Sequence, residues 1–194
     1  FGDTGMTHAS EQTPFRPLSP YAVAKVTAQN LVTNYRIAYG LYACTGILFN
    51  HESPLRPERF VTQKIVRGAH AVAAGKAKQL SLGNLDISRD WGWAPEYVTV
   101  MAKMLTPVSP TDLVIATGRS VSLSYFVERA FRNFKLDWRE FVQVDDALRR
   151  PSDIHYGAGD PSLAAQVLGW RAQYDVDYVV DQMCEAVARP AAAD

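Results

Sequence analysis

The stretch that decides the fold runs from residue 20 to residue 49 and reads PYAVAKVTAQNLVTNYRIAYGLYACTGILF. Apolar residues recur at three- and four-residue spacing up to Gly40, which predicts a helix of about twenty residues. Ser19 is the candidate N-cap, and Pro20 suits the first helical position, where a missing N–H leaves no bond unmade. Residues 41–49 form a nearly continuous apolar run, typical of a strand buried on both faces of a parallel sheet. A helix followed by a buried strand favours an α/β fold.

The same two patterns continue along the rest of the chain. Helical spacing predicts further helices at residues 60–74, 95–105, 122–134, 161–168 and 176–188. Shorter apolar runs predict strands at residues 79–82 and 113–117, and the polar segment 50–58 is expected to be a loop. The G-x-G-x-x-G turn with which a dinucleotide-binding fold opens does not occur in the sequence.

Composition narrows the classes of protein that this chain can represent. Its 194 residues carry 20 basic and 20 acidic side chains, and 47% of the residues are hydrophobic. Such a chain can bury enough surface to be globular, and its balanced charge provides no basic surface for nucleic acid or an anionic membrane. Two cysteines are too few for a disulfide framework, and no apolar run is long enough to span a bilayer. We therefore expect a cytoplasmic protein with no nucleic-acid or membrane partner, and we identify no metal site.

Tyr21 and Lys25 form a pair with a chemical use. They are four residues apart on the predicted helix and therefore lie on one face, about one turn apart. An ammonium group stabilises a nearby phenolate, so such a tyrosine could exchange a proton with a sugar hydroxyl while a hydride moves to a nicotinamide. The alternative is a chance spacing, with the tyrosine packed and the lysine in solvent. For the bare pair that alternative is favoured, and the surrounding motifs reverse the balance.

These motifs are specific. Residues 14–25 read PFRPLSPYAVAK, residues 49–54 read FNHESP, residues 89–92 read RDWG and residues 114–118 read VIATG. In these motifs the chain resembles the GDP-mannose 4,6-dehydratases, a family of extended short-chain dehydrogenases/reductases. The tyrosine and lysine alone would indicate only the superfamily, whereas NHESP and RDWG point to the dehydratases. The resemblance covers nearly the whole chain.

The resemblance implies an architecture and an activity. The α/β fold would be the C-terminal portion of an NAD(P)-binding, Rossmann-type, doubly wound parallel sheet, with a smaller mixed α/β substrate-binding domain. Residues 1–50 would belong to the cofactor domain, and residues 51–194 mainly to the sugar-nucleotide domain, with some segments returning to the sheet. The implied activity is that of an NADP-dependent lyase that converts GDP-mannose to GDP-4-keto-6-deoxymannose, working as a homodimer or homotetramer.

The resemblance also implies which residues meet the cofactor. Tyr21 would be the catalytic tyrosine, and Lys25 would stabilise its phenolate and hold the nicotinamide ribose. His51 and Arg56 match positions that contact NADP, and a planar, always charged guanidinium suits phosphate. Without the resemblance, His51 could equally be a capping or core-edge histidine.

A second set of residues is implied to bind the sugar nucleotide. Asn50 would lie near the hexose or its phosphates, and Lys64 would reach a phosphate from its helix. Backbone and amide groups of Leu82, Gly83 and Asn84 would approach the guanine edge.

The diphosphate and the ribose complete this implied site. Arg89 and Arg150 are the candidates for the diphosphate, which a neutral protein must neutralise locally. Asp153 takes the place of a family glutamate that binds the nucleotide, and its side chain is one methylene shorter. The alternative for Arg89 is an ordinary surface ion pair with Asp90.

Two catalytic groups of the family are expected outside the given residues. The threonine that polarises the C4 hydroxyl and the glutamate that removes the C5 proton would lie just before Phe1, because Thr4, Thr7 and Glu11 stand at the wrong spacing. We therefore expect a natural protein that is longer by roughly a hundred or more residues. We also expect the given residues alone to be inactive.

Two other interpretations stay open. A GDP-4-keto-6-deoxymannose reductase or a nucleotide-sugar epimerase would share the tyrosine and lysine, and a reductase would need no eliminating glutamate. A non-catalytic remnant that only binds the sugar nucleotide, or a structural protein that uses an exposed sheet edge, would differ in class. Failure of the full-length protein to bind GDP or GDP-mannose in a titration would favour the non-catalytic interpretation.

Overall fold

A long helix, α1 (Pro20–Tyr39), follows the loop formed by residues 1–19 in a computed structural model that describes residues 1–149 and 153–189. Ser19 accepts a hydrogen bond from the Ala22 N–H at 3.1 Å, and Pro20 occupies the first turn. Gly40 ends the helix in the left-handed region, with φ 63°, where a glycine carries no Cβ penalty. The predicted helix and both of its caps are confirmed. Within the described part of the chain no residue of α1 is buried.

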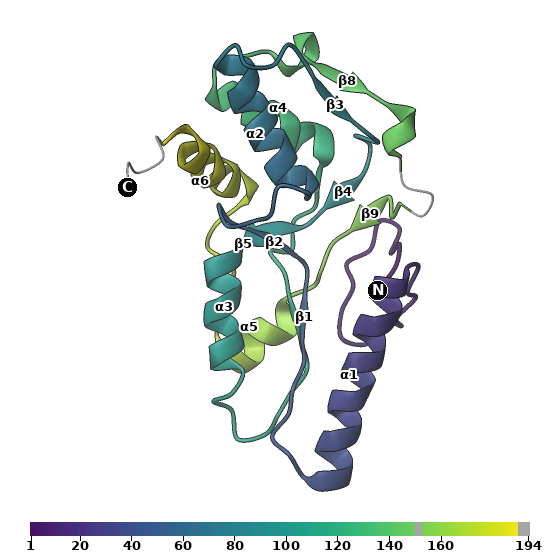
Figure 1. Cartoon of the computed structure of the whole chain (residues 1–194). Coiled ribbons are helices and arrows are strands. Elements are labelled where there is room, and N and C mark those ends of the chain that lie inside the picture. The colour runs from purple at the N-terminus through teal and green to yellow at the C-terminus, as the bar shows by residue number, and fades with distance from the viewer. Residues whose placement is uncertain (150–152, 190–194) are drawn as a thin grey trace.

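Two parallel strand pairs run beside α1 (Figure 1). β1 (Gly46–Leu48) pairs with β6 (Leu113–Ile115), and β2 (Asn50–Glu52) pairs with β5 (Trp91–Trp93). In the second pair Asn50 lies opposite Trp91 and His51 opposite Gly92. Figure 1 shows β1 with α1 on one side and α3 (Ala94–Lys103) and α5 (Ser162–Leu168) on the other.

The two strands of the first pair, β1 and β6, differ in how deeply they are buried. β6 is buried along its whole length, as its apolar run predicted. The prediction for residues 41–49 was wrong in two respects, because β1 has only three residues and is half-buried. Leu113 and Ile115 pack against α3 and α5, whereas β1 pairs with β6 alone within the described residues. The apolar run therefore predicted that β1 is present but not where it begins and ends.

The remaining strands are short and form two further sheets. β3 (Leu80–Leu82) pairs in parallel with β8 (Val142–Val144). β4 (Ser88–Arg89) lies between β7 (Val121–Ser122), which is antiparallel to it, and β9 (Tyr156–Gly157), which is parallel. The loop expected at residues 50–58 was wrong at its start, because residues 50–52 form β2.

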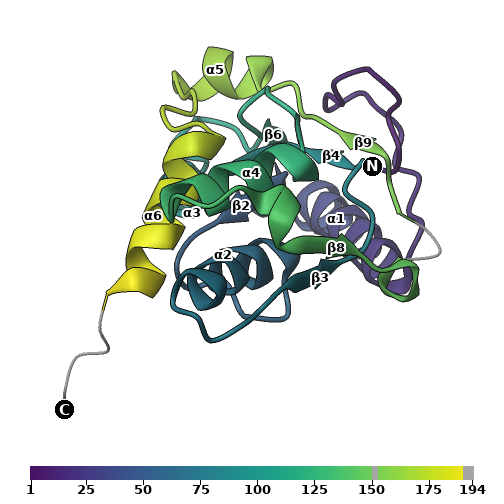
Figure 2. The same cartoon turned by 90° about the horizontal axis from the view of Figure 1, so that it is seen from above.

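Three helices build the larger hydrophobic core at one end of the molecule (Figures 1 and 2). They are α2 (Val61–Ala73), α4 (Leu123–Asn133) and α6 (Val176–Ala188), and their fully buried side chains include Ile65, Phe126, Phe131 and Met183. Two single-turn 3-10 helices, η1 (Trp138–Glu140) and η2 (Asp146–Leu148), flank β8. A smaller core joins α3, β6 and α5 through Tyr97, Val100 and Ala164. The five helices predicted after residue 60 are all present. The division at residue 50 stays a prediction.

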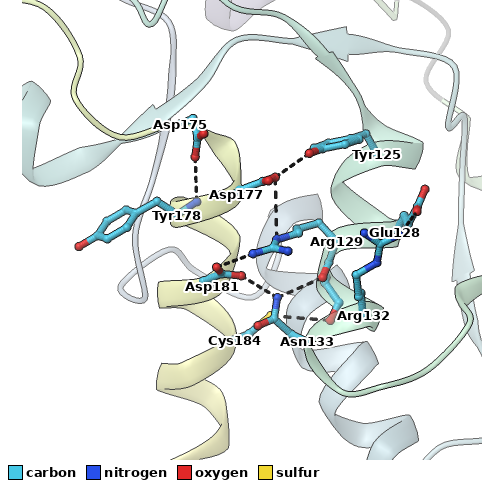
Figure 3. Close-up of polar contacts among 11 residues, drawn as sticks. Tyr125, Glu128, Arg129, Arg132, Asn133, Asp175, Asp177, Tyr178, Asp181 and Cys184 are labelled. Carbon is cyan, nitrogen blue, oxygen red and sulfur yellow. Dashed lines mark hydrogen bonds and ion pairs between the residues drawn. The ribbon is translucent and has the colours of Figure 1, made fainter.

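A polar network ties α4 to α6 at the rim of the larger core (Figure 3). The Tyr125 hydroxyl donates to Asp177 at 2.8 Å, and Arg129 Nη2 lies 2.6 Å from Asp181 Oδ2. Asn133 also donates to Asp181, at 2.8 Å. Because these side chains bridge two helices 48 to 52 residues apart in sequence, they set the register of one helix against the other.

A single carboxylate holds α1 against the strands. Both oxygens of Asp112 accept from Arg36 of α1, at 2.9 and 3.0 Å, and Oδ1 also accepts from the Thr45 N–H at 2.7 Å. Burial alone would raise the pKa of Asp112, but the hydrogen bonds from Arg36 and Thr45 outweigh burial and hold it below its ordinary value of 3.8. Because α1 has no buried residue, this contact attaches the helix to the strands, whereas the other α-helices are attached by buried apolar side chains.

A second carboxylate joins the sheets. Asp90 lies between β4 and β5 with 0% exposure, and its Oδ1 accepts from the backbone N–H and hydroxyl of Thr117 at 2.9 and 2.7 Å. Its Oδ2 accepts from the Gly118 N–H at 2.9 Å, and the Gly159 N–H also donates to it. Burial raises the pKa of Asp90, and these hydrogen bonds oppose part of that rise. The carboxylate thus fixes β4 and β5 relative to the turn after β6 and the segment after β9.

Replacing Asp112 by Asn is expected to destabilise the fold by about 2 kcal/mol at pH 7, because the bidentate ion pair with Arg36 is lost. A carboxyl whose folded pKa is depressed stabilises the fold above its unfolded pKa, and that stability is lost as the pH falls through its folded pKa. The difference between wild type and D112N in urea unfolding should therefore shrink below about pH 4. D146N, which removes an exposed ion pair with Arg149, should change little at any pH. A constant D112N difference from pH 7 to pH 2 would contradict this account.

Replacing Asp90 by Asn is expected to destabilise by about 2–3 kcal/mol, because an amide NH₂ cannot accept from the N–H groups that the carboxylate satisfies. The measurement is the urea midpoint, with exposed Asp86→Asn as the matched control. Equal midpoints for D90N and D86N would show that Asp90 does not hold these segments together.

Candidate active site

Tyr21 and Lys25 lie on one exposed face of α1, as their spacing predicted. The Lys25 ammonium is 6.0 Å from the centre of the Tyr21 ring, and Tyr21 is 74% exposed. Tyr21 also lies close enough to Arg56 to contribute to the raised pKa of that guanidinium. Tyr21 on α1 and Arg56 in the loop after β2 therefore interact electrostatically.

His51 is the middle residue of β2. Its Nδ1 is 2.8 Å from the Phe49 carbonyl oxygen, and its ring stacks on Tyr97 with centroids 5.0 Å apart. A carbonyl oxygen only accepts hydrogen bonds, so Nδ1 carries the proton of the neutral ring and Nε2 remains an acceptor. The core-edge position that the sequence allowed for this histidine is the one found, and it leaves Nε2 available for binding.

A buried ion pair orients Arg56. Glu52 is 2% exposed, and its two oxygens accept from Arg56 Nε at 2.6 Å and Nη2 at 2.9 Å. Thr62 donates to the same carboxylate at 2.9 Å, and the His51 carbonyl accepts from Arg56 Nη2 at 2.8 Å. The guanidinium also lies 4.4 Å from the Phe60 ring centre. The hydrogen bond from Arg56 to Glu52 is the main reason that the pKa of Arg56 is raised.

Glu52 and Thr62 were missed by the analysis of the sequence. Glu52 stands four residues before Arg56 in FNHESPLR, a spacing at which opposite charges meet, and this was the signal available. Thr62 lies at the start of α2, and nothing in its sequence surroundings pointed to a carboxylate partner.

The residues expected to bind the sugar nucleotide lie on several elements. Asn50 is exposed at the start of β2. Lys64 extends from α2 and donates to the Ser81 carbonyl at 2.7 Å, so its ammonium lies beside β3. The structure therefore places Lys64 next to residues 82–84, which the sequence assigned to the same ligand.

Residues 82–84 differ in which of their groups are available to bind a ligand. The Leu82 side chain is 1% exposed in the larger core, and its carbonyl accepts from the Asp145 N–H at 2.7 Å. Gly83 passes so close to η2 that a Cβ would lie 2.8 Å from the Leu148 oxygen. Asn84 Oδ1 accepts from the Asp86 N–H at 2.9 Å, which leaves its amide NH₂ to donate. Gly83 and Asn84, rather than the Leu82 side chain, suit a ligand contact.

Arg89 lies on β4, half-buried, next to Asp90 in sequence. The expectation of an exposed ion pair between these neighbours is wrong, because Asp90 is fully buried and receives Thr117 and Gly118 instead. Asp153 is half-buried in the segment before β9. Arg150 lies outside the described residues.

The donors gathered here suit a nicotinamide dinucleotide. The imidazole Nε2 can accept, the phenol can donate or accept, and Lys25 and Arg56 carry the positive charge that phosphate or a ribose hydroxyl prefers. Among residues 1–149 and 153–189, no three or more His, Cys, Asp or Glu side chains are placed to hold a metal ion. In the same ranges no helix is both long and apolar enough to cross a membrane.

This chain is similar to known proteins over most of its length. Residues 1–183 match the sequence model of the family described as GDP-mannose 4,6 dehydratase. GDP-mannose 4,6 dehydratase 2 of Arabidopsis thaliana is 45% identical over 176 residues, which cover 91% of this chain and 47% of the relative. GDP-mannose 4,6-dehydratase of Sinorhizobium fredii strain HH103 is 46% identical over 195 residues, covering 92% of this chain and 55% of the relative. The chain thus spans about half the length of these curated relatives.

A solved structure supports the fold. RMD from Pseudomonas aeruginosa, complexed with NADPH, matches with a TM-score of 0.81 at 19% identity, over 91% of this chain and 57% of that one. The predicted Rossmann-type α/β fold is confirmed by this likeness. Together with the match over residues 1–183, the comparisons show that this chain belongs to the GDP-mannose 4,6-dehydratase family.

Proposed function

We propose that the protein carrying this chain is a lyase that converts GDP-mannose to GDP-4-keto-6-deoxymannose with NADP. Membership of the family supports the reaction. The observation that carries the assignment of residues is that Tyr21 and Lys25 share one exposed face of α1, with the ammonium 6.0 Å from the centre of the phenol ring. Arg56 follows β2 in the chain, and the carboxyl ends of parallel strands are where α/β folds bind ligands, which supports this assignment.

Tyr21 is the proposed proton acceptor. Its oxygen takes the proton of the C4 hydroxyl, and the Lys25 ammonium stabilises the resulting phenolate and holds the nicotinamide ribose. A bound nicotinamide cofactor supplies a temporary store for the hydride, which leaves C4 and later returns to C6. The exposure of Tyr21 on its helix leaves the hydroxyl accessible to a sugar.

Arg56 and His51 are the proposed NADP contacts. Glu52, Thr62 and Phe60 restrict the Arg56 side chain, so little rotamer freedom remains to be lost when it binds a phosphate. The choice of NADP over NAD rests on this guanidinium, and the structure of RMD with NADPH is compatible with it.

Asn50, Lys64, Gly83, Asn84, Arg89 and Asp153 are the proposed contacts of the sugar nucleotide, with Arg150 and the backbone of Leu82. Lys64 donates to the Ser81 carbonyl of β3 and Asn84 follows that strand, whereas Arg89 lies on β4 of another sheet. Two cations placed singly can neutralise a diphosphate without giving the chain a net charge.

The groups needed for elimination are not assigned to the described residues. Glu11, the nearest carboxylate considered, accepts from the Val114 N–H at 2.7 Å and caps the edge of β6. Thr4 and Thr7 hydrogen-bond to each other's carbonyl groups. We further propose that the protein is a cytoplasmic homo-oligomer, for which the free state of Cys44 and Cys184 suits a reducing compartment.

Replacing Tyr21 by Phe is expected to lower kcat by about 10²- to 10⁴-fold, because the proton acceptor for the C4 hydroxyl is lost. The assay follows conversion of GDP-mannose by the natural polypeptide that contains this chain, with binding of GDP unchanged. Tyr35→Phe, on the exposed side of the same helix, is the matched control and should keep wild-type kcat. Equal kcat for Y21F and Y35F would refute the proposed role.

Replacing Arg89 by Ala is expected to weaken GDP binding about ten- to hundredfold, because a charge-assisted hydrogen bond to the diphosphate is lost. Isothermal titration with GDP measures this effect, and the affinity for NADPH should stay unchanged. Arg67→Ala removes an exposed cation from α2 and serves as the control. If R67A weakens GDP binding as much as R89A does, the contribution is general charge rather than a contact.

A further inference from the structure

Tyr97 is a buried aromatic residue that contacts His51 of the candidate cofactor site. It lies on α3, is 1% exposed, and stacks on the His51 ring at 5.0 Å with an interplanar angle of 27°. Its other contact is the edge of Trp170, with centroids 6.0 Å apart. The ring thus connects the smaller core to the one histidine of the site.

Gly92 makes this contact possible. It lies on β5 directly opposite His51 in the parallel register. A Cβ at residue 92 would lie 2.4 Å from Tyr97 Cε2 and 2.5 Å from its hydroxyl oxygen, closer than any real contact. The Tyr97 ring therefore occupies the space that the side chain of any residue other than glycine at position 92 would need.

The imidazole is held by two contacts that depend on each other, because stacking on Tyr97 keeps Nδ1 turned toward the Phe49 carbonyl. The Phe49 carbonyl, 2.8 Å from Nδ1, selects the tautomer with the proton on Nδ1. The Tyr97 ring fixes the plane of the imidazole by stacking. A histidine held in this manner presents Nε2 as an acceptor in a constant position.

The Tyr97 hydroxyl does not explain the residue's position. It is buried, and none of the residues in 1–149 and 153–189 hydrogen-bonds to it. Burial raises the pKa of the phenol, so the hydroxyl stays neutral at any working pH. The flat face of the ring is what contacts the site.

We propose that Tyr97 is a positioning residue: admitted by Gly92, its ring holds the His51 imidazole so that Nε2 would accept a hydrogen bond from an N–H or O–H donor of the cofactor. This inference rests on the proposed function only for the identity of that ligand. The orientation of His51 by Tyr97 is a property of the chain itself.

The decisive comparison is between Tyr97→Leu, which removes the stack, and Tyr97→Phe, which keeps it. In the natural polypeptide that contains this chain, Y97L should weaken NADPH binding about three- to tenfold, the range expected for one aromatic pair, and leave GDP binding unchanged. Y97F should bind both as wild type does. Val100→Ala, one turn along in the same core, controls for lost core volume without removing a ring. NADPH fluorescence and titration with GDP measure the two affinities.

A spectroscopic readout tests the orientation without the cofactor. Long-range ¹H–¹⁵N correlation of the histidine rings should show His51 as the Nδ1–H tautomer in wild type, Y97F and V100A, and as a mixture in Y97L. If Y97L and V100A weaken NADPH binding equally, or if Y97F is as damaging as Y97L, the positioning role is wrong. If wild type does not bind NADPH, the proposed cofactor fails, and the spectra still decide whether Tyr97 holds the imidazole.

A second pair of variants keeps Tyr97 intact, in case Y97L does not fold. Gln at residue 51 can place an amide oxygen near the position of Nε2, whereas Asn reaches only the position of Nδ1. His51→Gln should therefore retain more NADPH affinity than His51→Asn. The reverse order would overturn the assignment of Nε2 as the acceptor.

Discussion

The arrangement of the site depends on the Asp90 carboxylate, which is completely buried between two short strands. It receives the N–H groups of the turn after β6 and of Gly159, and so fixes segments that are distant in sequence. Arg89 precedes Asp90 on β4, and Gly92 follows it on β5, where it pairs with His51. Asp90 therefore fixes both the proposed diphosphate contact and the strand that pairs with β2. A buried carboxylate is tolerated here because it is fully hydrogen-bonded.

The two sides of the proposed reaction are held by different physical means. α1 carries Tyr21 and Lys25 but buries no residue within the described chain, so the ion pair between Arg36 and Asp112 places it. His51 and Arg56 are placed instead by a core, through the Tyr97 ring and the buried Glu52 carboxylate. The first arrangement rests on a half-buried ion pair, and the second on aromatic stacking together with a buried ion pair.

Prediction from sequence succeeded where a local pattern was long enough to be read. The helix of residues 20–39, with its Ser19 cap and Gly40 end, and the buried strand β6 follow from periodicity and apolar runs. The strands β2, β4, β5, β7 and β9 have two or three residues and mixed polarity, so no alternation marks them. For the proposed site, spacing pointed to Tyr21 and Lys25 and the family resemblance to His51 and Arg56, and these assignments stay predictions. The roles of Asp90 and Tyr97 could not be found, because each acts through partners far away in sequence.

The sequence by itself determined the family, the order of the long elements and the residue types available for chemistry, because these depend on neighbours a few positions apart. Only the tertiary structure decided that Asp90 is a buried hub rather than the partner of Arg89, that the Leu82 side chain belongs to the core, and that Gly92 admits Tyr97 beneath His51. The physical reason is that burial and stacking are set by what other segments bring to a residue, and a linear pattern contains no record of those segments.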